Sequence, residues 1–492
     1  MNYSRILALA LLTIVSLSGC ETFLEETPQQ NIPTEGAISD PFTANAAMLG
    51  IYNQLSSANL YGCNIIMVSE LMGTNAIWGG SFANFRDIAN RTMLSNNATP
   101  AGLYTSGYGT ITNANFLINE FAKGVPGLSS EDSARYVGEC LWARGMVLFD
   151  MVRYFAQPYG FTADNSHLGV PVVRGFAETI DDLNGRPSRA TVQQVYDSVI
   201  VDLEAAIALL PESVAEVGGY GIRATANTAR GILMRVYLQQ DDYASCAALC
   251  EDIILSGEYQ LNATPDIFYL SKNSSESMYE VQFNNQDNPG VNASLTAFAT
   301  PSGSDGRAGR GDLRVSTTSD ASVVPNRLRL AFRSGPGVVG TSSTTLFQAG
   351  DLRIGLLLAA PVNNRLHTAK YFRDADLSDN IPVLRYAEVL ITYAECLNEL
   401  GDQANAQIYL NEIRNRAGLA DWAGATDQVS LRTEILNERR RELNFEGDDF
   451  HVLMRTSQPS IRSVSFGSSS LIWPIPQAEI DVNPNLVQNP GY

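Results

Sequence analysis

The stretch YAECLNELGDQANAQIYLNEI, from Tyr393 to Ile413, decides the fold of this protein. Its apolar residues recur at helical spacing on both sides of Gly401 and Asp402, and a Gly-Asp pair between two such runs predicts a tight turn. Ala406 is small enough to let the two helices approach closely. The stretch therefore predicts an antiparallel helix hairpin with the residue spacing of a tetratricopeptide unit.

A second stretch, LMRVYLQQDDYASCAALCEDI from Leu233 to Ile253, repeats this spacing. Asp242 takes the place of the turn acid, and Cys246 that of the small residue. Cys246 and Cys250 share a helix face, yet no histidine or second cysteine pair completes a zinc site, so we interpret both as packing residues. Amphipathic helix pairs often resemble each other, and a solenoid needs at least three units. The repeat alone thus indicates stacked hairpins without establishing them.

Helical periodicity extends over much of the remaining chain, and convincing strands are few. The helical patterns cover residues 43–55, 110–121, 130–155, 191–210, 224–238, 243–255, 387–400, 404–416 and 431–444. Between residues 284 and 350 the composition changes to Gly, Ser, Thr, Asn and Pro, with SGSDGRAGRGD as its extreme. The sequence therefore predicts a mainly α-helical protein with one long irregular insertion, which carries functional or mobile loops.

The composition is that of a large globular protein that does not bind nucleic acid. The chain has 492 residues, of which 45% are hydrophobic and 17% charged, and its formal net charge is −19. Binding to nucleic acid or to anionic lipid headgroups requires clustered Lys and Arg, which this charge balance disfavours. Six cysteines in so long a chain are too few for a disulfide framework.

The N-terminal stretch LSGCETFLEE, from Leu17 to Glu26, predicts a lipid attachment site. Arg5 and the apolar run of residues 6–17 form a secretory signal that is too short to span a bilayer. The small residues before Cys20 match the bacterial lipobox, in which the cysteine is acylated and becomes the new N-terminus. The alternative is a buried N-terminal helix with Cys20 as a core residue. We predict a signal peptide at residues 1–19, a lipid-anchored polar tether at 20–40 and a globular domain at 41–492.

Three segments of the C-terminal half closely resemble the SusD/RagB family of Bacteroidetes outer-membrane lipoproteins. They are VLRYAEVLITYAECLNELGD (Val383 to Asp402), NERRRELNFEGDDF (Asn437 to Phe450) and WPIPQAEIDVNPNLVQNPGY (Trp473 to Tyr492). The last is the most specific, because Pro-Ile-Pro, Glu479, Asn483-Pro484 and the terminal Asn-Pro-Gly-Tyr recur in this order in the family. One departure is DDFHVLMR from Asp448, a packing segment where the family more often has an aromatic followed by Asp-Leu and Arg. The resemblance covers essentially the whole mature chain.

The resemblance implies a SusD-like fold, mainly all-α, built on tetratricopeptide-like helix hairpins with a long irregular, loop-rich insertion. An N-terminal part would cover about residues 41–280, and the family's C-terminal part about 281–492. It also implies a lipoprotein of the cell surface without catalytic activity, which captures an oligosaccharide as the lid of a SusC-like TonB-dependent outer-membrane transporter. Since some relatives serve peptide import, a peptide-binding lid of a RagAB-like importer is the alternative.

Ligand contacts are expected in the loop NAIWGGSFANFRD, from Asn75 to Asp87. Sugar rings stack an apolar face on aromatic side chains, while their hydroxyls bind amide, carboxylate and guanidinium groups. The loop supplies both kinds of side chain, and Gly79-Gly80 should project the indole ring of Trp78 from irregular backbone. Phe82 and Phe85 are better explained as the anchor of a short helix. The family places ligand contacts in an equivalent loop, and our candidates here are Asn75, Trp78, Phe82, Asn84 and Arg86.

Two further places supply weaker candidates. FNNQDNPG, from Phe283 to Gly290, carries Asn285 and Asp287, whose side chains suit hydroxyl recognition or a Ca²⁺ loop. The same residue types favour turns because they bond their own backbone, and we favour the turn. Tyr104, in LYTSGYG, is the other candidate, although the following helix is placed to bury it. We predict no cofactor and no metal ion, with Ca²⁺ left open as an alternative.

An enzyme is the rival class. A lipid-anchored glycoside hydrolase would need two carboxylates about 5–9 Å apart, and none of the 52 acidic residues stands out as such a pair. No G-x-S-x-G, H-E-x-x-H or P-loop motif occurs, and His167, His367 and His451 lie in unrelated contexts. The glutamates of the C-terminal helices are better explained as partners of nearby arginines. We therefore predict structural ion pairs for Glu388, Glu395 and Glu442.

Overall fold

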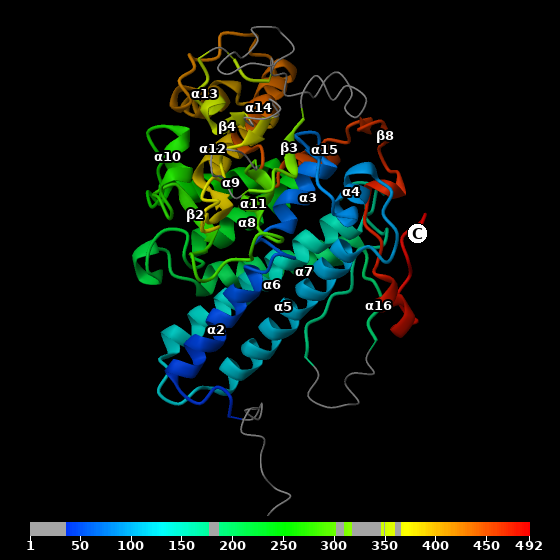
Figure 1. Ribbon diagram of the computed structural model, residues 1–492. Helices are drawn as coiled ribbons and strands as arrows, with labels where there is room; N and C mark the ends of the chain where they lie inside the picture. Colours follow the sequence, from blue (N-terminus) through cyan, green and yellow to red (C-terminus); the bar gives the residue numbers. More distant parts are fainter. Residues whose placement is uncertain (1–35, 177–185, 302–308, 317–345, 349, 360–365) are drawn as a thin grey trace, which may run out of the picture.

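The computed structural model describes residues 36–176, 186–301, 309–316, 346–348, 350–359 and 366–492. The predicted signal peptide, Cys20 and most of the tether lie outside these ranges, as do residues 302–308 and 317–345 of the glycine-rich insertion. Helices dominate the described part of the chain (Figure 1). The long ones are α2 (Pro41–Leu55), α3 (Asn64–Met72), α4 (Ala83–Asn90), α5 (Ala98–Lys123), α6 (Ser130–Phe155), α7 (Val192–Leu209), α8 (Ala226–Gln239), α9 (Tyr243–Leu255), α12 (Tyr386–Glu399), α13 (Gln403–Arg416) and α14 (Gln428–Leu443).

Short helices and strands occupy the connections between them. The short helices are α10 (Pro265–Leu270), α11 (Leu295–Ala299), α15 (Asp449–Arg455), α16 (Gln477–Val482) and the 3₁₀ turns η2 (Val214–Val217), η4 (Leu352–Leu356) and η5 (Ser469–Leu471). The strands are β1 (Ala76–Trp78), β2 (Ser277–Val281), β3 (Leu313–Val315), β4 (Leu357–Ala359), β5 (Leu366–Thr368), β6 (Ile381–Arg385), β7 (Ser460–Ile461) and β8 (Val464–Ser465). The predicted mainly α-helical class is confirmed.

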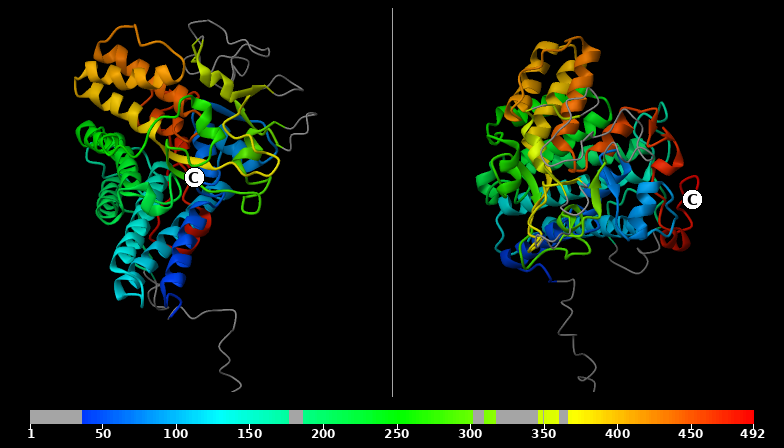
Figure 2. Two further views of the ribbon diagram at one scale, coloured as in Figure 1. Left: turned by 90° about the vertical axis from the view of Figure 1, so that its left-hand side faces the viewer. Right: turned by 45° about the horizontal axis from the view of Figure 1, so that its top comes forward.

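The long helices stack into one curved row. Each of α5, α6, α7, α8 and α9 packs against the next, α9 packs against α12, and α12 packs against both α13 and α14. Figure 2 (left) shows this row running from α6 and α7 through α8 and α9 to the C-terminal helices. The short strands and irregular segments lie on the other side of the row, so the row acts as the scaffold on which they are held.

Both predicted hairpins form, as α8–α9 and α12–α13. The carboxylate of Asp242 caps α9 by accepting a hydrogen bond from the Ser245 amide, and Asp402 caps α13 in the same way. Gly401 has φ +89°, a left-handed conformation that glycine adopts without strain and that reverses the chain. The small residues at Cys246 and Ala406 are fully buried between the paired helices. The spacing of the two stretches was therefore a correct guide to the scaffold.

Helix α5 begins 12 residues before the expected start at residue 110. Asn97 caps its first turn by accepting from the Thr99 amide, and Pro100 suits the first turn, where its missing N–H costs nothing. The sequence pattern missed this half because glycines interrupt it. Gly107 is explained by packing, since a Cβ there would lie 2.7 Å from Sδ of Met151 on α6. No described helix is long and apolar enough to cross a membrane.

Four antiparallel strand pairs join segments that are far apart in the sequence. β1 pairs with β3 so that Trp78 lies opposite Leu313, and β2 pairs with β6, which leads directly into α12. The other pairs are β4 with β5 and β7 with β8. The β1–β3 pair is the one that matters for the site, because it brings the predicted aromatic loop against the end of the insertion.

The C-terminal segment packs across the end of α6. The Trp473 amide donates to the carbonyl of Tyr154 at 2.8 Å, and the Asn489 side chain donates to the carbonyl of Phe155 at 2.7 Å. Arg189 holds Asn489 from the other side with a 2.8 Å hydrogen bond. Phe450 belongs to the segment DDFHVLMR, which differs from the family pattern. It is fully buried in α15, as expected for a packing role.

Buried ion pairs bind α14 to its neighbours. Glu442 accepts from Arg385 at 2.6 Å and also pairs with Arg416 and Arg353. Burial opposes ionisation of Glu442, but the three guanidinium groups hold its pKa well below the ordinary value. Glu388 pairs with Arg235 and Glu395 with Arg455. The predicted structural ion pairs are confirmed, and the five cysteines in the described ranges are free and buried.

Candidate functional site

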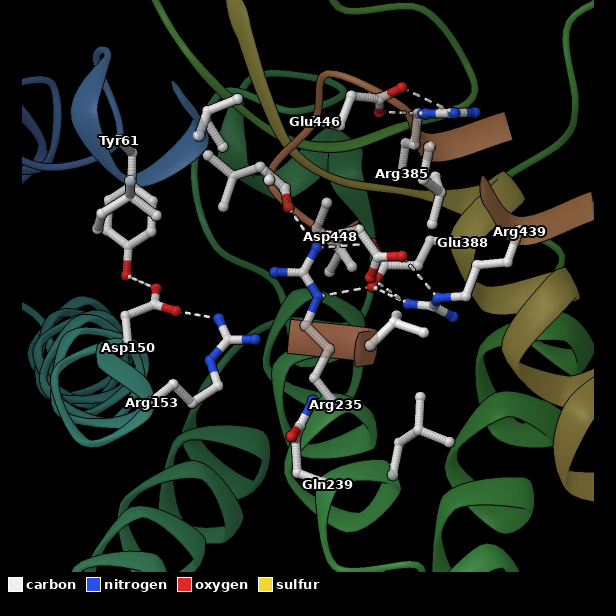
Figure 3. Close-up of a pocket in the computed structure, with 18 of the residues that line it drawn as sticks. Tyr61, Asp150, Arg153, Arg235, Gln239, Arg385, Glu388, Arg439, Glu446 and Asp448 are labelled. Carbon is white, nitrogen blue, oxygen red and sulfur yellow. Dashed lines mark hydrogen bonds and ion pairs between the residues drawn. The ribbon is translucent and has the colours of Figure 1, made fainter. Parts of the chain in front are cut away.

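The charged cavity drawn in Figure 3 is part of the scaffold and is too small for a ligand. It has a volume of about 40 Å³, enough for about one water molecule. Its charged groups face one another: the Tyr61 hydroxyl donates to Asp150 at 2.5 Å, and Arg235 and Arg439 pair with Glu388 and Asp448. Because these charges are matched within the protein, the cavity has a structural role.

An aromatic cluster around Trp78 is the best candidate for a ligand surface. The Trp78 ring lies 4.9 Å from Phe85 and 5.5 Å from Phe298, and Phe82 lies 6.1 Å from Phe298. The guanidinium of Arg310 covers the Phe82 ring at 4.6 Å and the Phe298 ring at 5.6 Å. We call these five residues the aromatic shelf. Phe85 and Phe298 are buried, whereas Trp78, Phe82 and Arg310 keep part of their surface in solvent.

Polar partners hold Arg310 over the rings. Its Nε donates to Asp312 at 2.8 Å, and its Nη1 donates to the amide oxygen of Asn292 at 2.7 Å. The shelf thus presents an aromatic face beside a guanidinium, a carboxylate and a carboxamide, the combination that recognises a sugar ring and its hydroxyls. The Nε1 of Trp78 is a buried donor without an acceptor among the described residues.

Trp78 does not project from a loop, which corrects the expectation from Gly79-Gly80. It is the last residue of strand β1. The two glycines after it let the chain that follows β1 approach segment 310–314 closely. A Cβ on Gly80 would lie 2.4 Å from Cγ of Asp312, and the Gly79 amide donates to the Asp312 carbonyl at 2.7 Å. Phe85 is buried and anchors α4 to the core, as interpreted. Phe82, just before α4, also packs there but keeps part of its ring in solvent, so it serves both the packing and the shelf.

Asn75 points to a different place. It is buried, its amide donates to Glu70 at 2.8 Å, and its oxygen accepts from Arg440 at 2.7 Å. It lines a cavity of about 260 Å³ between α14 and α15, near Leu436 and Gln458. Because both ends of the Asn75 carboxamide are bonded within the protein, Asn75 serves the packing of α14 rather than the aromatic shelf.

The other residues predicted to contact the ligand lie in separate environments. Asn84 donates to Thr99 at 2.7 Å, and Arg86 lies exposed on α4. Tyr104 is only 4% exposed, with its ring against Tyr108 and Phe155, so it is not part of an accessible surface.

The polar segment from Phe283 to Gly290, which follows β2, forms a turn, as favoured from the sequence. Asn284 accepts from the amides of Gln286 and Asp287 at 2.7 and 2.9 Å, which leaves Asn285 and Asp287 exposed on its outside. Within the described residues, no group of three or more His, Cys, Asp or Glu is arranged to hold a metal ion.

The histidines have packing environments. Both ring nitrogens of His167 are bonded, to the Thr162 hydroxyl at 2.9 Å and the Gln157 carbonyl at 3.0 Å. His367 bonds the Leu313 carbonyl at 3.0 Å. His451 is buried, and burial together with Arg153 and Arg235 lowers its pKa well below the ordinary value. Each histidine thus has a place in the packing.

Three residues of the site were missed by sequence reasoning: Asn292, Arg310 and Asp312. Arg310-Gly311-Asp312 ends the stretch SGSDGRAGRGD, which drew attention only through its composition. A polar Arg-Gly-Asp beside a short strand was the available signal, but nothing local relates it to Trp78.

Glu70 anchors Asn75 beside α14 and supplies a pH test of this part of the fold. It accepts from the Gly447 amide at 3.0 Å, and burial raises the pKa of its carboxyl from 4.5 to about 8, with a further contribution from Asp449. Between pH 4.5 and about pH 8, the Glu70 carboxyl therefore keeps its proton in the folded protein and loses it in the unfolded chain. The free energy of unfolding therefore falls as pH rises through this range.

Glu70→Gln is expected to remove this decline, which for the wild type is on the order of 3 kcal/mol. Urea unfolding at about pH 5 and about pH 8.5 measures it, with the exposed Glu216→Gln as the matched control. Equal pH dependence in Glu70→Gln and wild type would contradict the buried proton.

Two family models match separate parts of the chain. One, described as SusD family, matches residues 361–492, and the other, described as starch-binding associating with outer membrane, matches residues 22–238. These matches support a SusD/RagB family protein. The SusD-like proteins P2 and P38 of Formosa agariphila are 25% and 23% identical to it, each over 98% of both chains.

Solved SusD-superfamily structures share the fold. A structure titled as a putative sugar binding protein from Bacteroides vulgatus superposes with a TM-score of 0.76 at 23% identity, covering 93% of this chain and 99% of the other. A SusD-like carbohydrate binding protein from the same species gives 0.74 at 18% identity, covering 91% and 97%. The predicted SusD-like fold is confirmed.

Proposed function

We propose that this SusD/RagB protein is a binding lipoprotein of the outer membrane that captures an oligosaccharide on the aromatic shelf. The observation that carries the proposal is the stacking of Arg310 over Phe82, with Asn292 and Asp312 bonded to the same guanidinium. The starch-binding family description and the sugar-binding titles of structural relatives support the same ligand class. The protein acts by binding and delivery, not by catalysis.

Delivery needs a partner in the membrane, and the family resemblance supplies its kind. We propose that the protein is the lid of a SusC-like TonB-dependent transporter at the cell surface and passes its ligand inward. Helix α2 begins at the lower end of the molecule, and α4, α11 and β3, the elements at the shelf, lie above that end (Figure 1), which suits a lid that is anchored at one end.

Calorimetric titration of the soluble chain, produced without residues 1–20, against a panel of oligosaccharides and peptides tests the ligand class. We expect saturable binding to a saccharide. Binding to peptides alone would overturn the glycan proposal in favour of the peptide-binding lid, because an aromatic shelf with polar neighbours also suits a peptide backbone.

The lipid anchor is tested by Cys20→Ala in the full-length chain. Each buried methylene of an acyl chain contributes about 0.8 kcal/mol, so two or more chains hold the protein firmly. We expect Cys20→Ala to move most of the protein from the membrane fraction to the soluble fraction. Cys250→Ala, at a buried core cysteine, is the matched control and should stay with the membrane. An unchanged distribution of Cys20→Ala would show that no lipid is attached there.

A further inference from the structure

Charged residues are nearly absent from the part of the chain that forms α2 to α5. Between residues 41 and 119 there are four among 79, although 17% of the whole chain is charged. Glu70 is buried, and Arg91 donates to the carbonyl of Ile88 at 2.9 Å. The other two, Arg86 and Asp87, lie on α4. The outward sides of α2 and of α5 up to residue 119 therefore carry no charge at all, in a protein of net charge −19.

These two sides form one surface. α2 and α5 run side by side (Figure 1), and Asn59, just after α2, donates to Ser106 on α5 at 3.2 Å. Six exposed residues define what we call the neutral face: Phe42, Leu49 and Gly50 of α2, and Thr105, Gly109 and Asn113 of α5. Phe42 is 82% exposed. Within the described residues, a ring so exposed has no role in packing.

The two glycines of the neutral face are not explained by the fold. A Cβ added to Gly50 or Gly109 would meet nothing within 4 Å, and neither residue has a positive φ. Glycine within a helix is less favourable than alanine, so these two positions weaken their helices. No contact among the described residues compensates for that cost. A second protein surface that approaches the backbone closely would account for them.

The size of the neutral face suits a protein interface. With 15 and 26 residues, α2 and α5 are about 22 and 39 Å long at 1.5 Å per residue. Two adjacent helices about 10 Å wide then offer roughly 600 Å², against about 800 Å² per partner in a standard interface. The centres of such interfaces are depleted of charge.

We propose that the neutral face packs against the transporter, an assignment that rests on the proposed function for the partner's identity. Twenty residues separate Cys20 from Pro41, so α2 lies within about 70 Å of the anchored lipid. Anionic lipid would require Lys and Arg, which this face lacks. A second copy of the chain carries the same negative charge and would be repelled.

Arginine substitutions test this face in the full-length lipoprotein, expressed together with its transporter. Gly50→Arg and Gly109→Arg place a charge and a long side chain in the interface, and we expect the amount of transporter that co-purifies in detergent to fall at least tenfold. Ile408→Arg is the matched control, since Ile408 is 59% exposed on the distant helix α13; it should leave co-purification unchanged. Equal co-purification in all three variants would overturn the proposal.

Three further measurements keep the result specific. Gly109→Ala should melt at the same or a higher temperature than wild type, which shows that helix α5 tolerates a side chain. A photo-reactive residue at position 109 should form an adduct with the transporter and at position 408 should not. Adducts with lipid or with a second copy alone would overturn the assignment. Oligosaccharide binding by soluble Gly109→Arg should equal wild type, so loss of the proposed ligand and loss of the docking face are distinguishable.

Discussion

In titrations with an oligosaccharide that the wild-type chain binds, Phe82→Ala is expected to raise Kd about 30-fold, a loss of about 2 kcal/mol. The substitution removes the ring that carries Arg310 at 4.6 Å and exposes a gap above Phe298. A sugar then loses its stacking surface, and the guanidinium loses its defined position. Arg310→Ala should weaken binding by a similar factor, because it removes the group that Asn292 and Asp312 orient.

A matched stack elsewhere in the molecule provides the control for this prediction. Arg373 lies 4.6 Å from the half-buried ring of Phe372, which packs against Phe268 and Tyr269 and not on the shelf. Phe372→Ala should therefore lose similar packing and keep wild-type Kd. Equal losses in Phe82→Ala and Phe372→Ala would point to a general loss of structure, and wild-type affinity in Phe82→Ala would move the ligand away from the shelf.

Arg385→Ala is expected to lower the free energy of unfolding by about 3–5 kcal/mol. Arg385 is fully buried and bonds Glu276 at 2.8 Å, Glu442 at 2.6 Å and Glu446 at 2.7 Å. It therefore joins the end of β6 to the residue before β2, to α14 and to the segment after α14. Its removal takes the cation that all three carboxylates share and leaves them with Arg416, Arg353 and Lys370 as partners. Urea unfolding of the soluble chain at neutral pH measures the loss.

The control for Arg385 is an ion pair at the surface. Arg432 pairs with Glu399 while 40% of its side chain is exposed, and exposed pairs contribute about 0–1 kcal/mol. Arg432→Ala should therefore cost less than about 1 kcal/mol. If Arg385→Ala also lowered the free energy of unfolding by less than about 1 kcal/mol, the buried network would not hold α14 in place.

Local patterns predicted the scaffold well. The hairpins at α8–α9 and α12–α13 follow from apolar spacing, from the capping carboxylates of Asp242 and Asp402 and from the left-handed glycine at Gly401. All these signals act within a few residues, so they can be read along the chain. The N-terminal half of α5 was missed because glycines interrupt its pattern, among them Gly107, which packs against Met151.

The sequence by itself determined the helical class and the turns of the hairpins, because helix period and caps are local properties. It indicated structural roles for the C-terminal glutamates, but the tertiary structure chose their partners, since Glu388 pairs with Arg235 and Glu395 with Arg455. Only the tertiary structure decided which residues share the candidate site. Trp78 meets Phe298, and Phe82 meets Arg310, where β1 pairs with β3 across more than 200 residues of chain. A three-residue strand pair has no periodic signature, and its partner is chosen by burial and backbone hydrogen bonding once the scaffold has formed.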